Sequence, residues 1–522
     1  MNNNFADRIK KLSAAESHDC LWGGLKGIEK ESLRIAKDGS LSTRPQPAGL
    51  GSALTNRYIT TDFSEALLEF VTPTFSNTWE ALEFLVDVHQ FTYQQLDDEL
   101  LWVTSMPCVM NTDSDIPLAQ YGSSNVGRMK TIYRNGLGYR YGRKMQTIAG
   151  IHFNYSLPEA FWPIYQHIEQ RSDDAKTFRS EAYLGLLRNY RRISWIILYL
   201  FGASPALCKS FAMGTDLSMP SFDKNTFYQP FATSLRMSDL GYSNSTQAGL
   251  NISLNDLDEY IADLSAAIST PEPAFEKIGV KVGDEYRQLS ANQLQIENEY
   301  YSSIRPKRVA RSGERPTAAL HRDGIEYVEV RSLDLNIFDP VGISQNTMRF
   351  VEALLIYCLL QESPPLDQSE IQETAANHSA TATSGRDPEL KLSRQGKPVA
   401  LKEWASDILQ KVGQVAELID RGSDRDDFAQ AVTAQATIVA NSELTPSARI
   451  LRDLHDTNSG FFHYALDAAR NNQNYFASLD VTDDEHLKLF ADEAASSIGR
   501  QAEIEAADNI SLDEYLRHYF SS

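Results

Sequence analysis

The chain has 522 residues, of which 42% are hydrophobic and 23% charged, so it can form one large domain or about three smaller ones and is neither collagen-like nor largely disordered. Its 49 basic and 70 acidic residues give a formal net charge of −21, which disfavours a general nucleic-acid or anionic-membrane binder. The polar amino terminus and the short apolar stretches predict neither a secretory signal nor a membrane span. Four cysteines without a CxxC pair predict neither a zinc knuckle nor a disulfide framework, and they favour the cytoplasm.

The first two thirds of the chain mix strand and helix patterns. Segments rich in β-branched and aromatic residues predict strands at 27–35, 58–62, 67–72, 150–157 and 325–331. Apolar residues spaced three and four apart predict helices at 79–101, 180–200, 255–267 and 345–361. Because strands and helices do not alternate regularly, the pattern indicates an α+β fold around a mainly antiparallel sheet.

The character of the sequence changes after residue 362. The Glu-Ser-Pro-Pro run at 362–365 ends a helix, and 375–386 is small, polar and without periodicity, so we expect a loop or linker over 363–400. Helical patterns follow at 402–421, 425–439, 463–477 and 484–519. The sequence therefore predicts an α+β core at 1–362, the linker, and a helical region at 401–522 that packs on the core and contributes little chemistry.

Charge inside apolar strands is the most informative signal. Glu69 is the only charged residue of 67–72, and side-chain alternation points it the same way as Leu67 and Val71. An isolated ionised carboxylate is costly to bury. For this segment alone, the simpler interpretation is that its face meets solvent or that Glu69 pairs with an arginine.

The same pattern recurs in the other strands. Each predicted strand puts a charged or imidazole side chain on one face, and together these are Glu29, Glu31, Asp62, Glu69, His152, Glu329 and Arg331. If the strands are neighbours, one sheet face carries five carboxylates, a histidine and an arginine. Such a cluster repels itself unless cations neutralise it, and oxygen ligands with a single imidazole favour Mg²⁺ or Mn²⁺ over Zn²⁺.

A basic loop supplies candidate phosphate ligands. Four positive charges fall within the seven residues 305–311, which include Arg305, Lys307 and Arg311. Such a loop is usually solvated surface, but beside a metal cluster it fits a clamp on phosphoryl groups. The chain has no GxxxxGK[ST], GxGxxG or GxSxG pattern, so a nucleotide site here would be neither a P-loop nor a Rossmann site. Aromatic and polar residues also gather at 133–134, 236–242 and 299–301, although most of the 23 tyrosines are expected only to pack.

Long motifs occur in a fixed order along the chain. They are GIEKESLR at 27–34, ITTDFSEALLEFVTP at 59–73, AQYG at 119–122, YLFGASP at 199–205, ATSLR at 232–236, IRPKR at 304–308, YVEVRSLD at 327–334 and SARIL at 447–451. These motifs resemble those of the proteobacterial glutamate-cysteine ligases of type 1, also called γ-glutamylcysteine synthetases. The resemblance covers about residues 20–360 closely and fades near 363–400.

The resemblance implies a fold similar to glutamine synthetase, in which a curved, mainly antiparallel sheet forms a funnel-shaped active site. It implies ATP-dependent ligation of the γ-carboxylate of L-glutamate to the amine of L-cysteine through γ-glutamyl phosphate, the first step of glutathione biosynthesis. Mg²⁺, with Mn²⁺ as a possible substitute, and ATP as co-substrate are implied as well. So are feedback inhibition by glutathione, a monomer in the cytoplasm, and no nucleic-acid or membrane partner.

Motif by motif, the resemblance also implies roles for single residues. The metal ligands would be Glu29, Glu31, Asp62, Glu69, His152 and Glu329, and the catalytic residue would be Arg331, which stabilises the transferring phosphoryl group. Substrate would be bound by Tyr133, Arg134, Arg236, Tyr242 and Tyr301, chiefly around cysteine. Arg305, Lys307 and Arg311 stay the phosphate-binding candidates.

Alternative functions remain at this point. They are another magnesium-dependent carboxylate-amine ligase of the same fold, a non-catalytic member of that fold, a magnesium-dependent phosphatase or kinase, and a structural or regulatory binding protein. The complete set of candidate ligands argues against loss of activity. From the chain length we expect no second, ATP-grasp domain. Cysteine-dependent ADP release would discriminate among these functions.

Overall fold

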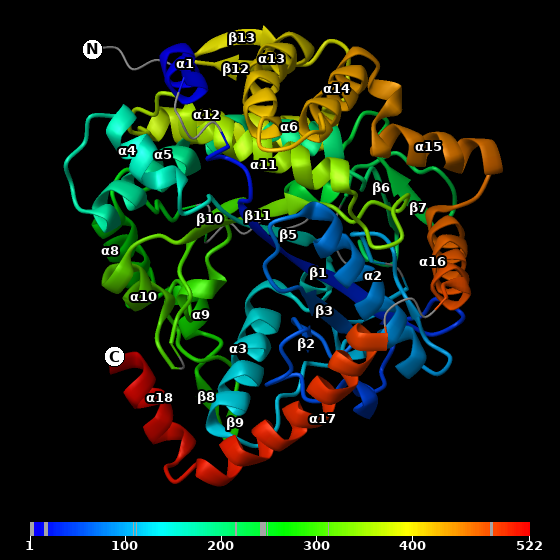
Figure 1. The fold of residues 1–522 in the computed structure, drawn as a ribbon. Coiled ribbons are helices and arrows are strands. Elements are labelled where there is room, and N and C mark those ends of the chain that lie inside the picture. Colours follow the sequence, from blue (N-terminus) through cyan, green and yellow to red (C-terminus); the bar gives the residue numbers. More distant parts are fainter. Residues whose placement is uncertain are drawn as a thin grey trace.

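A central seven-stranded sheet organises the computed structural model, which describes residues 5–14, 19–107, 109–110, 112–213, 217–240, 247, 249–311, 313–480 and 484–521 (Figure 1). The strand order is β10 (Ile304–Lys307), β11 (Tyr327–Leu333), β5 (Ile151–Ser156), β1 (Leu25–Ile35), β3 (Leu67–Val71) and β2 (Ile59–Thr61), and β4 (Leu100–Leu101) pairs with β1. Every pairing within this sheet is antiparallel. The predicted α+β class and antiparallel sheet are confirmed.

Helices cover one face of the sheet. On this face, α5 (Ala175–Ile193) and α6 (Trp195–Phe201) contact β11, and α5 also packs against α11 (Gln345–Leu360). The strands turn fully buried apolar side chains to the core, among them Phe153, Val328 and Val330. Because neighbouring side chains along a strand point to opposite faces, the residues between them form the second face, which carries Glu29, Glu31 and Glu329.

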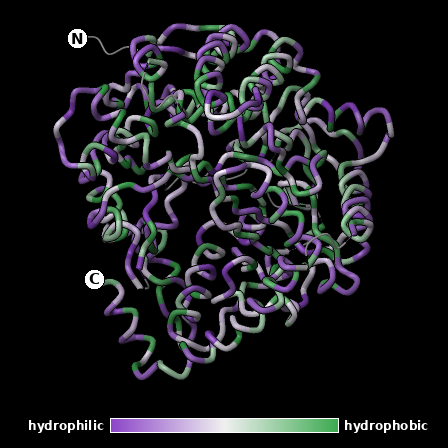
Figure 2. Tube along the Cα trace, viewed as in Figure 1, coloured by the Kyte–Doolittle hydropathy of each residue, from purple (hydrophilic) through white to green (hydrophobic). Residues whose placement is uncertain are grey.

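The carboxyl-terminal helices surround this core. Helices α13 (Leu401–Asp420) and α14 (Asp427–Ala440) pack on α11, and α16 (Phe461–Ser478) and α17 (Asp484–Ala507) pack on α2 (Thr78–Gln95). The last helix, α18 (Leu512–Ser521), reaches α3 (Asn125–Tyr141), as the red segment at the lower edge of Figure 1 shows. Figure 2 shows hydrophobic and hydrophilic residues alternating along these helices, as expected for amphipathic helices. The domain boundaries at 362 and 400 stay a prediction.

The remaining elements complete the layers. They are α1 (Phe5–Ala14), α4 (Phe161–Ile168), β6 (Ala206–Cys208), β7 (Thr226–Tyr228), α8 (Leu257–Ala267), α9 (Pro273–Glu276), β8 (Lys281–Val282), β9 (Glu285–Tyr286), α10 (Pro316–Asp323), α12 (Gln368–Ser384), β12 (Lys391–Arg394), β13 (Lys397–Ala400) and α15 (Pro446–Thr457).

The expectation of a loop over 363–400 is wrong. This segment forms α12 and the β12–β13 hairpin, whose two-residue turn has positive φ angles at Gln395 and Gly396. Helix α12 packs on α6 through small side chains such as the fully buried Thr381 and Ala382. A helix that buries alanine and threonine lacks the apolar stripe from which periodicity is recognised.

Smaller differences concern helix ends and one cysteine. The helix predicted at 79–101 ends earlier, because α2 stops at Gln95 and Asp97, which has a positive φ, starts the turn into β4. The predicted helices at 180–200 and 484–519 each form two helices, and α15 was not predicted. Cys208 is disulfide-bonded, contrary to expectation, because cysteines distant in sequence give no spacing signal, while Cys20 and Cys358 are buried free thiols. No helix among the described residues is long and apolar enough to cross a membrane.

Candidate active site

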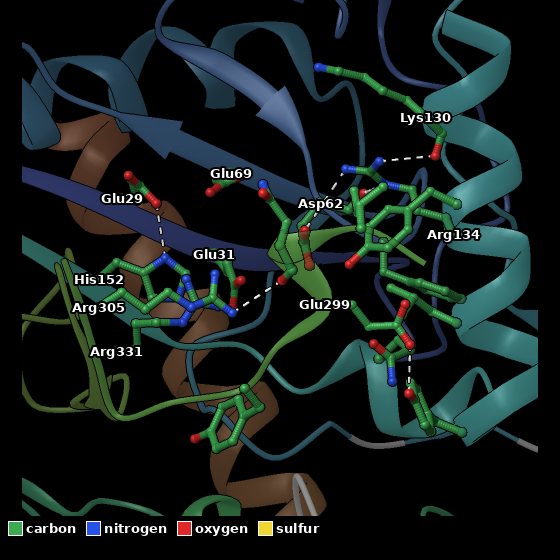
Figure 3. A pocket seen from close by; sticks show the side chains of 18 of the residues that line it. Glu29, Glu31, Asp62, Glu69, Lys130, Arg134, His152, Glu299, Arg305 and Arg331 are labelled. Atoms are coloured by element: carbon green, nitrogen blue, oxygen red, sulfur yellow. Dashed lines mark hydrogen bonds and ion pairs between the residues drawn. The ribbon is translucent and has the colours of Figure 1, made fainter. Parts of the chain in front are cut away.

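A cavity of about 640 Å³ lies against the charged face of the sheet. Strands β1, β3, β5, β10 and β11 form its floor, α3 forms one wall, and the short turn Glu297–Glu299 with the residues after it forms another. Figure 3 shows charged side chains from the strands and from α3 pointing into this space.

Strand pairing brings the predicted residues together. Across β1 and β5, Glu29 lies opposite His152, and across β1 and β3, Glu31 lies opposite Glu69. All seven residues predicted to share a sheet face line the cavity, namely Glu29, Glu31, Asp62, Glu69, His152, Glu329 and Arg331. The expectation that these strands are neighbours is confirmed.

Glu29, His152 and Glu329 form a group that fits a metal ion, because one ligand atom from each lies within 4.8 Å of the others. His152 Nδ1 is 2.9 Å from Glu29 Oε2 and 3.9 Å from Glu329 Oε1, and Asn154 Nδ2 donates to Glu29 Oε1 at 2.9 Å. Burial and the Arg331 charge lower the pKa of His152, which favours the neutral imidazole that metals bind. Burial opposes ionisation of Glu329, but the charges of Lys307 and Arg331 outweigh it and hold the Glu329 pKa well below its usual value.

Glu31, Asp62 and Glu69 form the other half of the carboxylate face. Glu31 Oε2 accepts a hydrogen bond from the Gly150 N–H at 2.6 Å. Burial and the charge of Asp62 nevertheless raise the pKa of Glu31 to about 8, and burial and the charges of Glu29 and Asp62 raise that of Glu69 well above its usual value. These two carboxyls ionise readily only when a cation lies beside them. The donor set, oxygen atoms and one imidazole, fits Mg²⁺ or Mn²⁺.

Basic side chains border the carboxylates. Arg331 Nη1 donates to Glu329 Oε2 at 3.1 Å, and Lys307 Nζ lies 3.3 Å from Glu329 Oε1. The buried Nε atoms of Arg331 and Arg305 have no hydrogen-bond partner among the described residues. A buried donor without an acceptor is costly, and an anion in the cavity would supply the acceptor.

Helix α3 contributes residues that sequence reasoning missed. Besides the predicted Tyr133 and Arg134, the cavity is lined from this helix by Met129, Lys130, Leu137, Arg140 and Tyr141. Arg140 Nη1 pairs with Glu299 Oε1 at 2.8 Å, with both side chains almost fully buried, and Tyr141 donates to the same oxygen at 2.6 Å. The residues of α3 that line the cavity are spaced three and four apart, which is the spacing of one helix face. Because they mix polar and apolar types, hydrophobic periodicity does not reveal this face in the sequence.

Three predicted residues do not line the cavity or are not described. Arg236 is buried beneath the wall, where its Nη2 donates to the Arg331 carbonyl at 3.0 Å and its Nη1 lies 3.5 Å from Asp334 Oδ1. Arg311 is exposed, outside the cavity. Tyr242 lies outside the described residues. Tyr301, Arg305 and Lys307 line the cavity as expected.

Comparisons with known proteins identify the family of this chain. The family model described as glutamate-cysteine ligase matches residues 9–381. A glutamate-cysteine ligase of Alcanivorax borkumensis is 51% identical over 518 residues, which cover 98% of each chain, and one of Pseudomonas paraeruginosa is 46% identical over 522 residues, which cover 100% of this chain and 99% of that one.

Comparison with solved structures also indicates this family and its fold. The crystal structure of a glutamate-cysteine ligase from Francisella tularensis in complex with AMP matches with a TM-score of 0.90 and 38% identity, covering 96% of this chain and 98% of that one. A bifunctional glutathione synthetase from Pasteurella multocida, 23% identical with a TM-score of 0.71, shares the fold over 91% of this chain and 55% of its own. The chain therefore belongs to the glutamate-cysteine ligase family.

Proposed function

We propose that the cavity carries out the ATP-dependent ligation of the γ-carboxylate of L-glutamate to the amine of L-cysteine, with γ-glutamyl phosphate as the intermediate. Membership of the glutamate-cysteine ligase family supports the overall reaction. The detailed proposal is supported by one observation: the carboxylate face and the cations Arg305, Lys307 and Arg331 line the same cavity. The reaction joins two anionic substrates, so it needs both the metal ions that the carboxylates would bind and the positive charge of the basic side chains.

The first step joins two anions, the glutamate γ-carboxylate and the γ-phosphoryl group of ATP. Glu29, His152 and Glu329, and the second carboxylate set of Glu31, Asp62 and Glu69, would hold Mg²⁺, which would neutralise phosphate charge. Arg331 lies beside this set, and its planar guanidinium offers paired donors to the oxygens of the transferring group. Lys307 and Arg305 hold the remaining phosphates, and the contact between Lys307 and Glu329 keeps the lysine at the edge of the metal site.

The second step needs cysteine beside the acyl phosphate, where its amine displaces phosphate. We place cysteine at the α3 side of the cavity, between Tyr133, Arg134 and Tyr301, which line it. The buried Arg140–Glu299 pair ties α3 to the opposite wall and so fixes the width of this end. A walled cavity also limits hydrolysis of the acyl phosphate by water.

A coupled assay tests this function. With glutamate and Mg²⁺ present, the protein should release ADP and form γ-glutamylcysteine in equal amounts when cysteine is added, and Glu329→Gln should lose both activities. Hydroxylamine should trap γ-glutamyl phosphate when cysteine is omitted. Equal ADP release without any amino acid would contradict the proposal, and equal use of unrelated amines would indicate another carboxylate-amine ligase.

The family resemblance supports four further properties. We propose that the protein acts as a monomer in the cytoplasm, that Mn²⁺ can replace Mg²⁺, and that glutathione inhibits it. Glutathione carries the γ-glutamyl and cysteinyl groups of the product and would therefore compete with glutamate for the same subsites. Sedimentation of the pure protein tests whether it is a monomer. Inhibition kinetics against glutamate test whether glutathione competes with glutamate.

A further inference from the structure

The AQYG motif at 119–122 has no role in the proposed function, yet its tyrosine contacts residues that line the active-site cavity. Tyr121 is 1% exposed and is not itself part of the cavity lining. It lies between helix α3 and the end of β2, where Thr61 is followed by Asp62. Its contacts therefore connect a carboxylate of the sheet with the α3 wall.

The ring of Tyr121 contacts two cations of that wall. The Arg134 guanidinium carbon lies 4.5 Å from the ring centroid, and Lys130 Nζ lies 5.3 Å from it. Both side chains line the cavity from α3, as Figure 3 shows. Like charges four residues apart on a helix repel each other, whereas the face of an aromatic ring attracts cations. The ring therefore offsets the repulsion and keeps two positive charges together at the wall.

The two cations differ in how they are neutralised. Arg134 Nη2 lies 3.9 Å from Asp62 Oδ1, whereas Lys130 forms no ion pair with any described residue. An ammonium group without a counter-charge, beside a guanidinium, attracts an anion. The proposed function assigns the cations of β10 and β11 to phosphate. The anions left for the α3 wall are the α-carboxylates of the two amino-acid substrates.

The hydroxyl of Tyr121 acts on the other side, on the backbone that presents Asp62. It donates to the carbonyl oxygen of Thr61 at 2.7 Å and to that of Asp62 at 3.0 Å. Arg134 Nε donates to the same Asp62 carbonyl oxygen. The ring and the hydroxyl thus have separate targets, the cations of α3 and the chain at Asp62.

We propose that Tyr121 is a positioning residue. Its ring holds Lys130 and Arg134 where they bind the α-carboxylate of an amino-acid substrate, and its hydroxyl holds Asp62 in place for the metal ion. This inference rests on the proposed function, because it takes glutamate and cysteine as ligands of the cavity and Asp62 as a metal ligand. Lys130 becomes a substrate-binding residue that the sequence analysis did not predict.

Two substitutions of Tyr121 separate the ring from the hydroxyl. Tyr121→Leu removes both, and we expect the KM for glutamate or cysteine to rise about fivefold or more while that for ATP changes about twofold or less. Tyr121→Phe keeps the ring and should restore the amino-acid KM values. It should still weaken Mn²⁺ binding about threefold or more, measured by electron paramagnetic resonance without substrates.

Tyr183 provides the matched control. It is also 1% exposed, and its hydroxyl accepts a hydrogen bond from the backbone N–H of Leu157, outside the active-site cavity. Tyr183→Leu and Tyr183→Phe should lower the melting temperature but leave every KM and Mn²⁺ binding unchanged. A general loss of packing would affect both tyrosines alike.

Lys130→Met tests the anion subsite without changing Tyr121. It should raise the same amino-acid KM, and it should have little further effect in Tyr121→Leu, because both changes disrupt one subsite. Unchanged amino-acid KM values in a folded Tyr121→Leu protein, or in Lys130→Met if the leucine variant does not fold, would overturn the role of the ring. Unchanged Mn²⁺ binding in Tyr121→Phe would overturn that of the hydroxyl. Failure of the wild type to ligate glutamate and cysteine would instead overturn the proposed function.

Discussion

Replacing Arg331 by lysine separates the geometry of this side chain from its charge. Arg331 contacts Glu329 through Nη1, and its buried Nε has no partner among the described residues, so a guanidinium edge remains for a phosphoryl group. Lysine keeps the positive charge but offers a point charge in place of a planar fork. If one charge-assisted hydrogen bond, worth about 1.5–3 kcal/mol, is lost in the transition state, kcat should fall about 10- to 150-fold.

The KM for ATP should change only about threefold or less, because Lys307 and Arg305 also hold the ground-state phosphates. Steady-state kinetics and thermal melting of the purified variant provide the measurement. Arg322→Lys is the matched control, since Arg322 pairs with Glu314 at 2.8 and 2.9 Å, outside the active-site cavity. A lower melting temperature with intact kcat would show that Arg331 only holds Glu329 in place and would refute its catalytic role.

Four further variants test other parts of the site. Glu69→Gln, which removes one charge at constant shape, should lose most activity even at saturating Mg²⁺; near-normal turnover would return Glu69 to a solvent-facing or arginine-paired role. Tyr301→Ala should raise the KM for cysteine far more than that for ATP, while 2-aminobutyrate still reacts in the wild type because the amine is the nucleophile; an unchanged cysteine KM would remove Tyr301 from the subsite. Leu516→Ala, which strips α18 of a buried contact beneath α3, should cost about 2 kcal/mol or more of unfolding free energy, whereas the exposed Leu489→Ala should cost little; equal losses would contradict the packing. Glu31→Gln should stabilise the metal-free protein increasingly as pH rises from about 5 to 8, read as the difference in melting temperature from the wild type in chelator; a constant difference would contradict the raised pKa.

The sequence predicts the chemistry of the floor of the cavity better than that of its walls. The two-residue period of a strand determines which side chains share a face, so the carboxylate face follows once the strands are recognised. Register is a tertiary property, however. That Glu29 faces His152 and Glu31 faces Glu69 depends on turns and packing that no single segment encodes.

The walls depend on contacts between distant segments. Arg140 meets Glu299 across 159 residues of sequence, and nothing in either segment alone marks the pair as a site. Arg236 is a further case: its motif resembles a substrate ligand, and the structure shows that the side chain lies beneath the wall and contacts the Arg331 backbone, so its role in substrate binding stays a prediction. Helix α12 was missed because its buried residues are small. Each case reflects tertiary packing that overrides local pattern.

The two halves of the carboxylate face differ in how their charge is balanced, and this difference gives the sign of the pH prediction. Glu29 and Glu329 have protein cations or a hydrogen-bonding imidazole beside them, and their pKa values are lowered. For Glu31, which lies opposite Glu69, burial and the charge of Asp62 raise the pKa from 4.5 to about 8. Between these values the folded protein retains a proton that the unfolded chain has lost, so the contribution of Glu31 to stability falls as pH rises. The glutamine variant lacks this titration, and its advantage in chelator must therefore grow with pH. A bound divalent cation favours the ionised carboxylate, so saturating Mg²⁺ should remove that advantage, and an advantage that persists would place the cation elsewhere.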